Sequence, residues 1–341
     1  VIPHNFQFQN TIVGGLSGID YNPATNSYFI ISDERSNTSP ARFYTANIHI
    51  NNYKIDSVQF TSVHILKQPN GMPFPSFKTD AQRTTDPESI RFNPKKNKLI
   101  WTSEGDRMTR AGKMIYQNPY IYEMDVAGSF KDSFFIPENV KMYATEKGAR
   151  ENGVFEGSSF DHTYKWLFVS MEEPIYDDGP KAAVDYYGAP IRITRYNTQT
   201  KKAVAQYGYR LDAIATAPKP ADAFAVNGVS EILWIGKNRF LVLERSYSTG
   251  TPQNTIKIFL ADISKASNVL QKTALHQNKN YQSATKKLLL NLNDLNRYID
   301  NIEGISPGPV LPNGHQSLIL IVDNNFNAFE KAQVFLFEII P

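Results

Sequence analysis

The segment "DPESIRFNPKKNKLIWTSEGD" (86–106) contains the structural unit that decides the fold of this chain. Two short runs, "SIRFN" and "KLIWTS", are rich in β-branched and aromatic residues, and a polar turn that contains Asn and Pro separates them. This pattern predicts a β-hairpin. Glu88 stands at the start of the first run, and Glu104 directly follows the second run. The unit is therefore an acid, two strands and a second acid.

The same unit returns four more times along the chain. The further segments are "GLSGIDYNPATNSYFIISDE" (15–34), "VFEGSSFDHTYKWLFVSMEEP" (154–174), "VSEILWIGKNRFLVLERSY" (229–247) and "IEGISPGPVLPNGHQSLILIVDNN" (302–325). The aligned residues of the first strands are Ser17, Glu88, Glu156, Glu231 and Glu303, which lie about 70 residues apart. A fixed period of this kind is the sequence signature of a repeat architecture.

Further strand-like runs follow the hairpin, for example "ARFYTANI" (41–48) and "SVQFTSVHIL" (57–66). Four strands in each repeat predict the blades of an all-β protein, a β-propeller. Five units predict five blades. A sixth, degenerate blade stays open, because the period exceeds the usual blade length of about 40–50 residues and leaves long spacers.

The ends of the chain are expected to meet. The last unit stops after its third strand (333–340), so we expect the N-terminal run 4–13 to complete that blade and close the ring. One helix is predicted over residues 284–299, where apolar residues recur at helical spacing. No inter-domain linker is recognisable, and the chain is predicted to form a single domain over residues 1–341.

Propeller geometry brings the aligned acids together. In a blade the first strand lies nearest the axis and pairs with an antiparallel second strand, so the start of the first strand and the end of the second meet on one face. We therefore expect the acids of both strands at the mouth of the channel. The predicted metal ligands are Glu88, Glu104, Glu156, Glu172, Glu231, Glu244, Glu303, Asp33 and Asp323.

Carboxylates gathered in this way repel one another, and a hard cation relieves that repulsion. Ca²⁺ is the predicted cofactor because it takes about 6–8 oxygen ligands. Arg35, Arg107 and Arg245 closely follow second-strand acids and are candidate catalytic residues, since a guanidinium pairs with anionic oxygens. A structural role also stays open for the acids, because acids in repeats often bond to neighbouring backbone or cap turns.

The composition limits the partners of the chain. Its 341 residues carry a formal net charge of +3 without a Lys/Arg tract, so nucleic acid is not expected as a partner. The absence of cysteine excludes disulfides and thiolate chemistry, and no apolar run is long enough for a membrane span.

The opening "VIPHNFQFQN" lacks an initiator Met, so we expect an exported protein whose signal has been removed. We expect a monomer that acts on a small anionic substrate.

Several motifs together resemble the phytase-like family, which is described by an esterase-like activity. They are "GGLSGIDYNPATNSYFIISDERS", "DPESIRFNP", "NGVFEGSSFD", "NGVSEILWI" and "IEGISPG", and the resemblance spans about residues 12–340. The resemblance implies a propeller related to calcium-dependent β-propeller phytases, and an exported, calcium-assisted hydrolase of phosphoric esters. Ser17 departs from the pattern, because the other four units carry Glu at this position.

Two other classes of function stay open. One is a lactonase or organophosphate hydrolase that uses a single axial metal. The other is a non-catalytic binding module in which any metal is structural. The sequence contains no nucleophile elbow, P-loop or HExxH motif that would decide between these classes.

Overall fold

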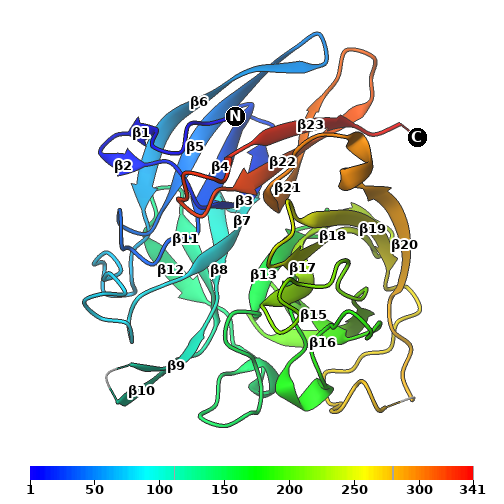
Figure 1. Ribbon diagram of the computed structural model, residues 1–341. Helices are drawn as coiled ribbons and strands as arrows, with labels where there is room; N and C mark the ends of the chain where they lie inside the picture. Colours follow the sequence, from blue (N-terminus) through cyan, green and yellow to red (C-terminus); the bar gives the residue numbers. More distant parts are fainter. Residues whose placement is uncertain (111, 279, 341) are drawn as a thin grey trace. The chain divides into compact units, whose positions relative to one another are not determined.

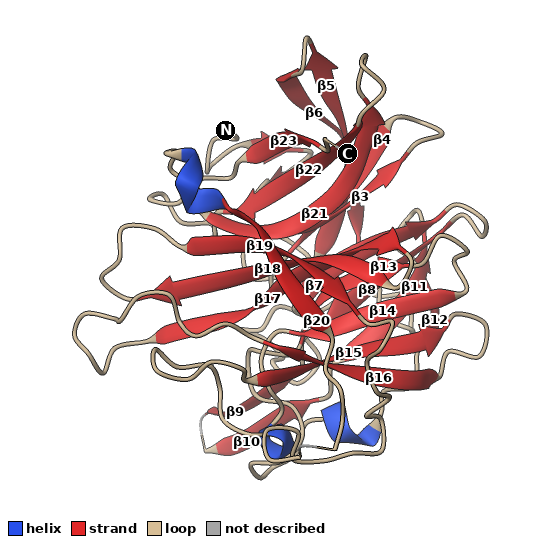
Figure 2. Ribbon diagram, turned by 90° about the vertical axis from the view of Figure 1, so that its right-hand side faces the viewer, coloured by secondary structure: helices blue, strands red, loops and turns tan. Residues whose placement is uncertain are grey.

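The computed structural model describes residues 1–110, 112–278 and 280–340, and nearly all of their regular structure is strand (Figure 1, Figure 2). The helical segments within these residues are three short 3₁₀ turns. They are η1 (Glu138–Val140), η2 (Tyr176–Asp178) and η3 (Leu292–Leu295). The prediction of an all-β chain is confirmed.

Five antiparallel sheets form the five blades of a β-propeller arrangement, as predicted, and the described residues contain no sixth blade. The structure divides into two compact units. Unit 1 comprises Val1–Ser103, Ile121–Ser133 and Asp300–Pro341, and unit 2 comprises Glu104–Tyr120 and Phe134–Ile299. A single domain over the whole chain stays a prediction.

Unit 1 contains blades 1, 2 and 5. Blade 1 consists of β3 (Leu16–Asn22), β4 (Ser27–Ser32), β5 (Arg42–Asn51) and β6 (Lys54–Ile65). Blade 2 consists of β7 (Pro87–Asn93), β8 (Lys98–Ser103), β11 (Tyr120–Asp125) and β12 (Phe130–Ser133). Blade 5 has three strands, β21 (Asn301–Val310), β22 (Gln316–Asp323) and β23 (Val334–Glu338). The first strand β3 lies against both β7 and β21.

The N-terminal segment bonds to the last blade through a single bridge. The backbone N–H of Ile2 donates to the carbonyl of Ala332 at 2.8 Å, just before β23. The run 4–13, expected as the fourth strand of this blade, instead contains a small hairpin of its own, β1 (Gln7–Phe8) with β2 (Thr11–Ile12).

Unit 2 contains blades 3 and 4. Blade 3 consists of β13 (Phe155–Phe160), β14 (Trp166–Met171), β15 (Pro190–Asn197) and β16 (Ala203–Arg210). Blade 4 consists of β17 (Ala225–Gly236), β18 (Arg239–Ser248), β19 (Thr255–Asp262) and β20 (Thr285–Asn291). The first strands β13 and β17 lie against each other. A separate hairpin joins β9 (Asp106–Arg110) to β10 (Lys113–Gln117).

The prediction of a helix over residues 284–299 is wrong. Its first part is β20, which pairs with β19 from Thr285 opposite Asp262 to Asn291 opposite Lys257, and the 3₁₀ turn η3 follows. The edge of β19 offers the backbone a hydrogen-bonding ladder, and the ammonium of Lys286 lies 2.6 Å from the carboxylate of Glu244. These non-local contacts outweigh the local preference for a helix, which is a weak prior.

Four first strands have a β-bulge at the residue that the repeat aligns, and in β17 the bulge falls one residue earlier, on Ser230. The pairing register shifts between Leu16 and Gly18, Pro87 and Ile90, Phe155 and Ser158, Val229 and Glu231, and Ile302 and Gly304. A bulge leaves a residue out of the ladder and re-aims its side chain. The repeat therefore places an acid at an irregular point of the strand in three blades and Ser17 there in blade 1, whereas Glu231 of blade 4 lies directly after the bulge, opposite Leu243.

A glycine follows three of the aligned residues because the neighbouring blade comes very close. A Cβ on Gly18 would lie 2.7 Å from the carbonyl oxygen of Glu88, and one on Gly304 would lie 2.8 Å from that of Ser17. In unit 2 a Cβ on Gly157 would lie 2.6 Å from the amide nitrogen of Ile232. Real Cβ atoms do not tolerate such distances, so the glycines permit the first strands to pack backbone against backbone.

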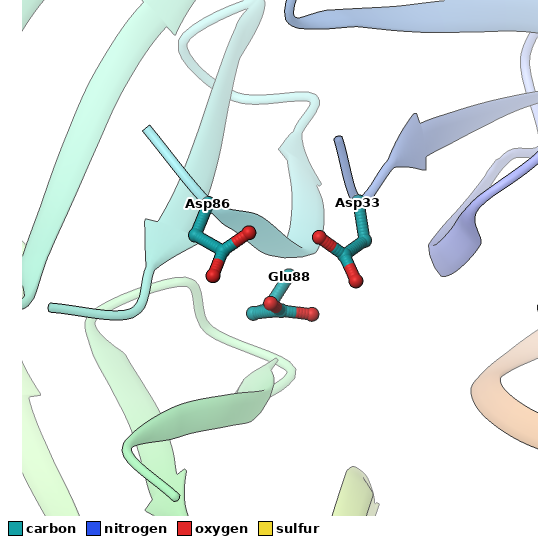
Figure 3. A group of neighbouring side chains, drawn as sticks. All are labelled: Asp33, Asp86 and Glu88. Atoms are coloured by element: carbon teal, nitrogen blue, oxygen red, sulfur yellow. The ribbon is translucent and has the colours of Figure 1, made fainter. Parts of the chain in front are cut away.

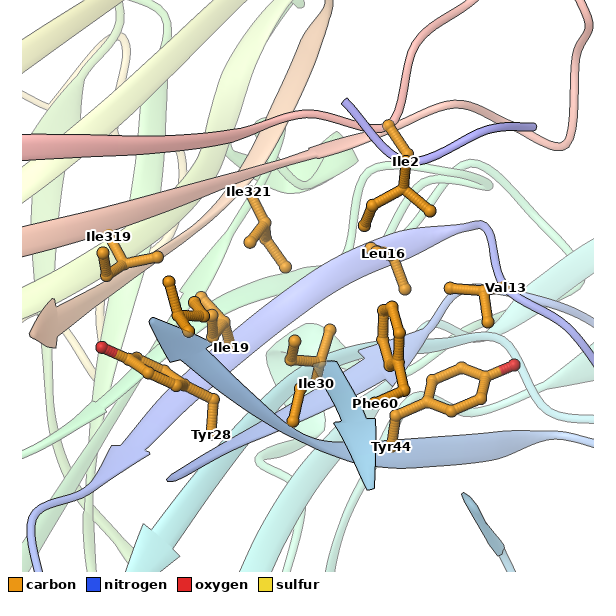
Figure 4. Packing of buried hydrophobic residues seen from close by; sticks show 13 residues of the cluster. Ile2, Val13, Leu16, Ile19, Tyr28, Ile30, Tyr44, Phe60, Ile319 and Ile321 are labelled. Atoms are coloured by element: carbon orange, nitrogen blue, oxygen red, sulfur yellow. The ribbon is translucent and has the colours of Figure 1, made fainter. Parts of the chain in front are cut away.

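A buried apolar cluster holds blades 1 and 5 together (Figure 4). It includes Ile19 and Ile30 of the first hairpin, Tyr44 of β5, and Ile319 and Ile321 of β22. Burying such side chains stabilises the fold by about 1.5–3 kcal/mol each. The cluster therefore fixes the hairpin of blade 1 against that of blade 5.

We expect Gly304→Ala to destabilise the protein by about 1–3 kcal/mol, as overpacking of a filled interior does. The added methyl group would meet the Ser17 carbonyl and also Ile321 Cγ1, at 2.7 Å. Urea unfolding measures the effect. Gly314→Asn is a suitable control, because its Cβ meets nothing within 4 Å and Asn tolerates a positive φ. Equal unfolding midpoints for Gly304→Ala and wild type would show that β21 and β3 can accommodate a methyl group between them.

Candidate functional site

Three carboxylates meet in unit 1 and form what we call the acid cluster, Asp33, Asp86 and Glu88. One carboxylate oxygen from each lies within 4.8 Å of the others. Figure 3 shows the three side chains pointing toward one another. Asp33 follows the end of β4, while Asp86 and Glu88 flank the start of β7. The cluster therefore joins the second strand of blade 1 to the first strand of blade 2.

Backbone contacts position each member of the acid cluster. The Asp33 N–H donates to the Gly15 carbonyl at 2.6 Å, which continues the hairpin of blade 1 by one residue. The Asp86 N–H donates to Ser103 Oγ at 3.1 Å. The carbonyl of Glu88 accepts a hydrogen bond from Ser17 Oγ at 2.7 Å. The aligned Ser17 thus ties blade 1 to blade 2 where other units carry an acid.

Two acids of blade 5 act on the same site. Glu303 and Asp323 are buried, and Asp323 pairs across the ladder with Asn301. Asn301 Nδ2 donates to Glu303 Oε1 at 2.8 Å, and the N–H of Asn325 donates to Asp323 Oδ1 at 2.8 Å. The negative charges of Glu303 and Asp323 both raise the pKa of Asp33.

The pKa of Asp33 is raised well above its ordinary value of 3.8. Burial is the largest cause, followed by the charges of Asp86 and Asp323, a hydrogen bond with Asp86, and the charge of Glu303. Each cause disfavours the ionised form of Asp33. The buried carboxylates of this site therefore repel one another, and a bound cation or a proton would reduce that repulsion.

One arginine pairs with the acid cluster. Arg35 Nε donates to Asp86 Oδ2 at 2.7 Å, and Nη2 contacts the same oxygen. The guanidinium lies over the ring of Phe77, 5.3 Å from its centroid. Arg35 is the predicted arginine for which the described contacts include a member of the acid cluster.

The acids of unit 2 have different surroundings. Glu104 Oε1 accepts from the N–H groups of Gly153 and Val154 at 2.8 and 2.7 Å. Glu231 Oε1 accepts from the N–H of Ser158 at 2.8 Å and so links β17 to β13. These carboxylates bond to the backbone of other strands, as structural latches do. Glu156 is buried at the bulge of β13.

Glu244 is the centre of a hydrogen-bonded network in unit 2. It accepts from Tyr209 Oη and Lys286 Nζ at 2.6 Å, and from the Asp212 N–H and Asn227 Nδ2 at 2.9 and 3.0 Å. Burial and the charge of Glu244 raise the pKa of Tyr209, which keeps the phenol a donor. The carboxylate of Glu244 is thus already neutralised by the chain.

The two remaining predicted arginines also bond within unit 2. Arg245 Nη2 lies 3.0 Å from Glu172 Oε1. Arg107 donates to the Thr145 carbonyl at 2.7 Å, contacts the Tyr176 hydroxyl, and lines an open pocket of about 440 Å³. Neither arginine bonds to the acid cluster in the described contacts.

Sequence reasoning missed Asp86 and Glu173. Asp86 stands two residues before Glu88, so both side chains project from the same face of an extended chain, and this spacing was the available signal. Glu173 follows Glu172, and burial and the charge of Glu172 raise its pKa to about 7 despite its ion pair with Lys181. No sequence pattern indicated that effect, because it depends on burial.

The acid cluster suits a hard divalent cation. Its donors are carboxylate oxygens, the ligand type that Ca²⁺ prefers, and they come from two strands that the bulge of β7 and the end of β4 hold in place. Burial and the neighbouring carboxylates raise the pKa of Asp33, which is the electrostatic environment that a bound cation would relieve. On donor chemistry the residues present fit a calcium ion.

The profile of one protein family, phytase-like, with the description "Esterase-like activity of phytase", matches residues 11–326. The match covers nearly the whole chain. The chain belongs to the phytase-like family. The resemblance carried by the motifs is thereby confirmed. No curated protein matches the chain.

Solved structures resemble this phytase-like chain in fold. An exo-β-1,3-galactanase from Phanerochaete chrysosporium shares 10% identity at a TM-score of 0.50, over 99% of this chain and 64% of that one. A xylan β-1,4-xylosidase from Bacillus halodurans shares 12% identity at a TM-score of 0.45, over 92% and 50%. The chain thus spans less than two thirds of either protein, and the likeness to the galactanase concerns the fold alone.

No helix among the described residues is long and apolar enough to cross a membrane.

We expect Asp33→Asn to stabilise the phytase-like protein in the presence of a chelator at neutral pH. A carboxyl whose pKa is raised on folding loses stability as the pH rises from its ordinary value, 3.8, through the raised one. Asn removes that loss, so we expect a gain of about 1 kcal/mol, or about 2 °C in the thermal midpoint. The gain should shrink below pH 4, where Asp33 is protonated in both states. A gain that persists at pH 3.5 would contradict the electrostatic cause.

We expect Glu244→Gln to destabilise the protein by about 2–3 kcal/mol, because it removes the buried charge that Tyr209 and Lys286 contact and leaves Lys286 with Asp212 alone as its carboxylate partner among the described contacts. Urea unfolding measures this loss, and the exposed Glu146→Gln serves as the control. If Glu244 is a latch, the calcium affinity of the variant should stay within twofold of wild type. A large loss of calcium affinity in a variant that remains folded would instead identify Glu244 as a metal ligand.

Proposed function

We propose that this phytase-like chain is a hydrolase of phosphoric esters that uses Ca²⁺ held at the acid cluster. The observation that carries the proposal is the meeting of Asp33, Asp86 and Glu88 beside Glu303 and Asp323, with the pKa of Asp33 raised as a result. The family description, which names phytase and an esterase-like activity, supports an ester substrate.

Asp33, Asp86 and Glu88 would hold the cation. When bound, Ca²⁺ would supply a Lewis acid that polarises a phosphoryl oxygen and orients water. Glu303 and Asp323 add negative charge without having to be ligands. Two predicted ligands of unit 2, Glu231 and Glu244, fit this function less well, because they accept hydrogen bonds from the chain itself.

Arg35 is our candidate for contacting the anionic substrate. Its guanidinium is part of the site through Asp86, whereas Arg245 is paired with Glu172 and Arg107 with Tyr176 and the Thr145 carbonyl. A planar fork of N–H donors matches phosphate oxygens. An exported monomer suits this proposal, since calcium sites of moderate affinity are typical of extracellular proteins.

A binding module with a structural metal is the second candidate. The observation in its favour is the latch role of the acids in unit 2, which shows that this chain uses repeat acids to hold strands together. The two candidates share the calcium site and differ in turnover. A lactonase-type activity differs in substrate, so lactone and phosphomonoester substrates must be assayed side by side.

The first experiment is thermal unfolding with chelator and then with Ca²⁺, beside hydrolysis of p-nitrophenyl phosphate. We expect Ca²⁺ at 100 times its Kd to stabilise the fold by about 2.7 kcal/mol and to switch on turnover. Asp33→Asn with Glu88→Gln should weaken Ca²⁺ binding at least about tenfold, while the exposed Asp56→Asn should not. Stabilisation without turnover would favour the binding module, and the absence of any calcium effect would overturn the proposed site.

A further inference from the structure

Arg35 is held in place by contacts that do not depend on its bond to Asp86. The carbonyl of Arg35 accepts from the Phe77 N–H at 2.9 Å and from Thr84 Oγ1 at 3.2 Å. The Phe77 ring lies beneath the guanidinium, and Ser76 Oγ donates to Asn37 Oδ1 at 2.9 Å. Residues 66–86, which connect β6 to β7, therefore form a cradle for this arginine.

The cradle is itself anchored in unit 1. Phe74 packs edge-on against Trp101 of β8, with ring centroids 5.8 Å apart. Phe74 and Trp101 are both buried. If Arg35 lost its bond to Asp86, its guanidinium would still stack on the Phe77 ring, and hydrogen bonds to its carbonyl would still hold its backbone. Stacking on an aromatic face leaves the N–H donors of a guanidinium available for other acceptors.

The bond between Arg35 and Asp86 competes with a cation. Both guanidinium contacts fall on one oxygen, Asp86 Oδ2, and the Asp86 carboxylate lies in the acid cluster beside Asp33. A cation coordinated by the cluster would repel the guanidinium and would use lone pairs of the same carboxylate. The guanidinium also offsets the negative charge that Asp86 offers to a metal ion, so binding of one weakens binding of the other.

We propose that Arg35 is an exchangeable counter-ion of the acid cluster. It neutralises Asp86 in the metal-free protein and yields this carboxylate to Ca²⁺. The released guanidinium, still stacked on Phe77, then takes an anionic oxygen of the substrate. The inference rests on the proposed function and adds an order of binding to it, in which the cation precedes a phosphate-bearing ligand.

This exchange has two opposite consequences for a variant without the guanidinium. Removing the competitor strengthens binding of the cation, because Asp86 is then available to it. Removing the fork of donors weakens binding of the anion. A guanidinium that merely oriented Asp86 as a ligand would give the reverse result for the cation, since its loss would leave Asp86 misplaced.

Isothermal titration with Ca²⁺, and with inorganic phosphate at saturating Ca²⁺, tests the proposal on the full chain. For Arg35→Gln we expect Ca²⁺ to bind about fivefold more tightly and phosphate at least about tenfold more weakly. Arg83→Gln is the matched control, because this arginine is in the same connection, is exposed, and pairs with Asp80. Its two affinities should equal those of wild type.

A second variant keeps Arg35 and therefore tests the proposal even if Arg35→Gln does not fold. Phe77→Leu keeps an apolar side chain under the guanidinium but removes the aromatic face. We expect its Ca²⁺ affinity to be unchanged and its phosphate affinity to fall several-fold. Intrinsic fluorescence, compared between wild type and a variant that lacks Trp166 and Trp234, reports whether the connection remains packed, because Phe74 contacts the Trp101 ring.

The outcomes separate this inference from the proposed function. If wild type binds no Ca²⁺, the proposed function fails, and the exchange fails with it. If wild type binds Ca²⁺ but Arg35→Gln binds it equally or more weakly, the exchange alone is overturned. Unchanged phosphate affinity in both variants would also overturn it. Phosphate binding by wild type that is equally tight in chelator would contradict the order of binding.

Discussion

Close packing of the first strands is the constraint on which the rest of the structure depends. In unit 1 the strand β3 lies against β21 on one side and β7 on the other, and Gly304 and Gly18 leave room for backbone contact at these two junctions. Ser17, at the middle of this row, hydrogen-bonds to the carbonyl of Glu88. Any acid at the aligned position must therefore lie near the next blade, whatever its role.

The β-bulges determine in which direction some side chains of the closely packed first strands point. A regular strand would alternate its side chains between the two faces of the blade, whereas a register shift at or beside the aligned residue changes the direction of side chains there. The acids of the first strands and those that follow the second strands have two kinds of surroundings. Glu231 and Glu104 are satisfied by backbone N–H groups, but Asp33 faces Asp86, Asp323 and Glu303. The same repeat thus supplies both latches and a site of unrelieved charge.

Membership of the phytase-like family and the propeller fold narrow the function without deciding it, because one fold serves many chemistries. The acid cluster is the feature that points to a particular chemistry. Carboxylates that raise the pKa of a neighbour favour a bound cation, and a guanidinium held beside them by Phe77 favours an anion as well. A calcium-assisted phosphoric ester hydrolase, our proposal, requires both.

The sequence by itself determined the repeat and the hairpin in each unit, because these features depend on local alternation and turn residues, and it left five or six blades open. It did not distinguish β20 from a helix, since the partners of that strand are on β19 and at Glu244. Nor did it show which acids meet. Asp86 bonds to Arg35, 51 residues away, and Glu231 to Ser158, 73 residues away. Only the tertiary structure decided which acids bond to backbone N–H groups and which meet other carboxylates, because burial, hydrogen-bond partners and the distance between charges are properties of the packed chain.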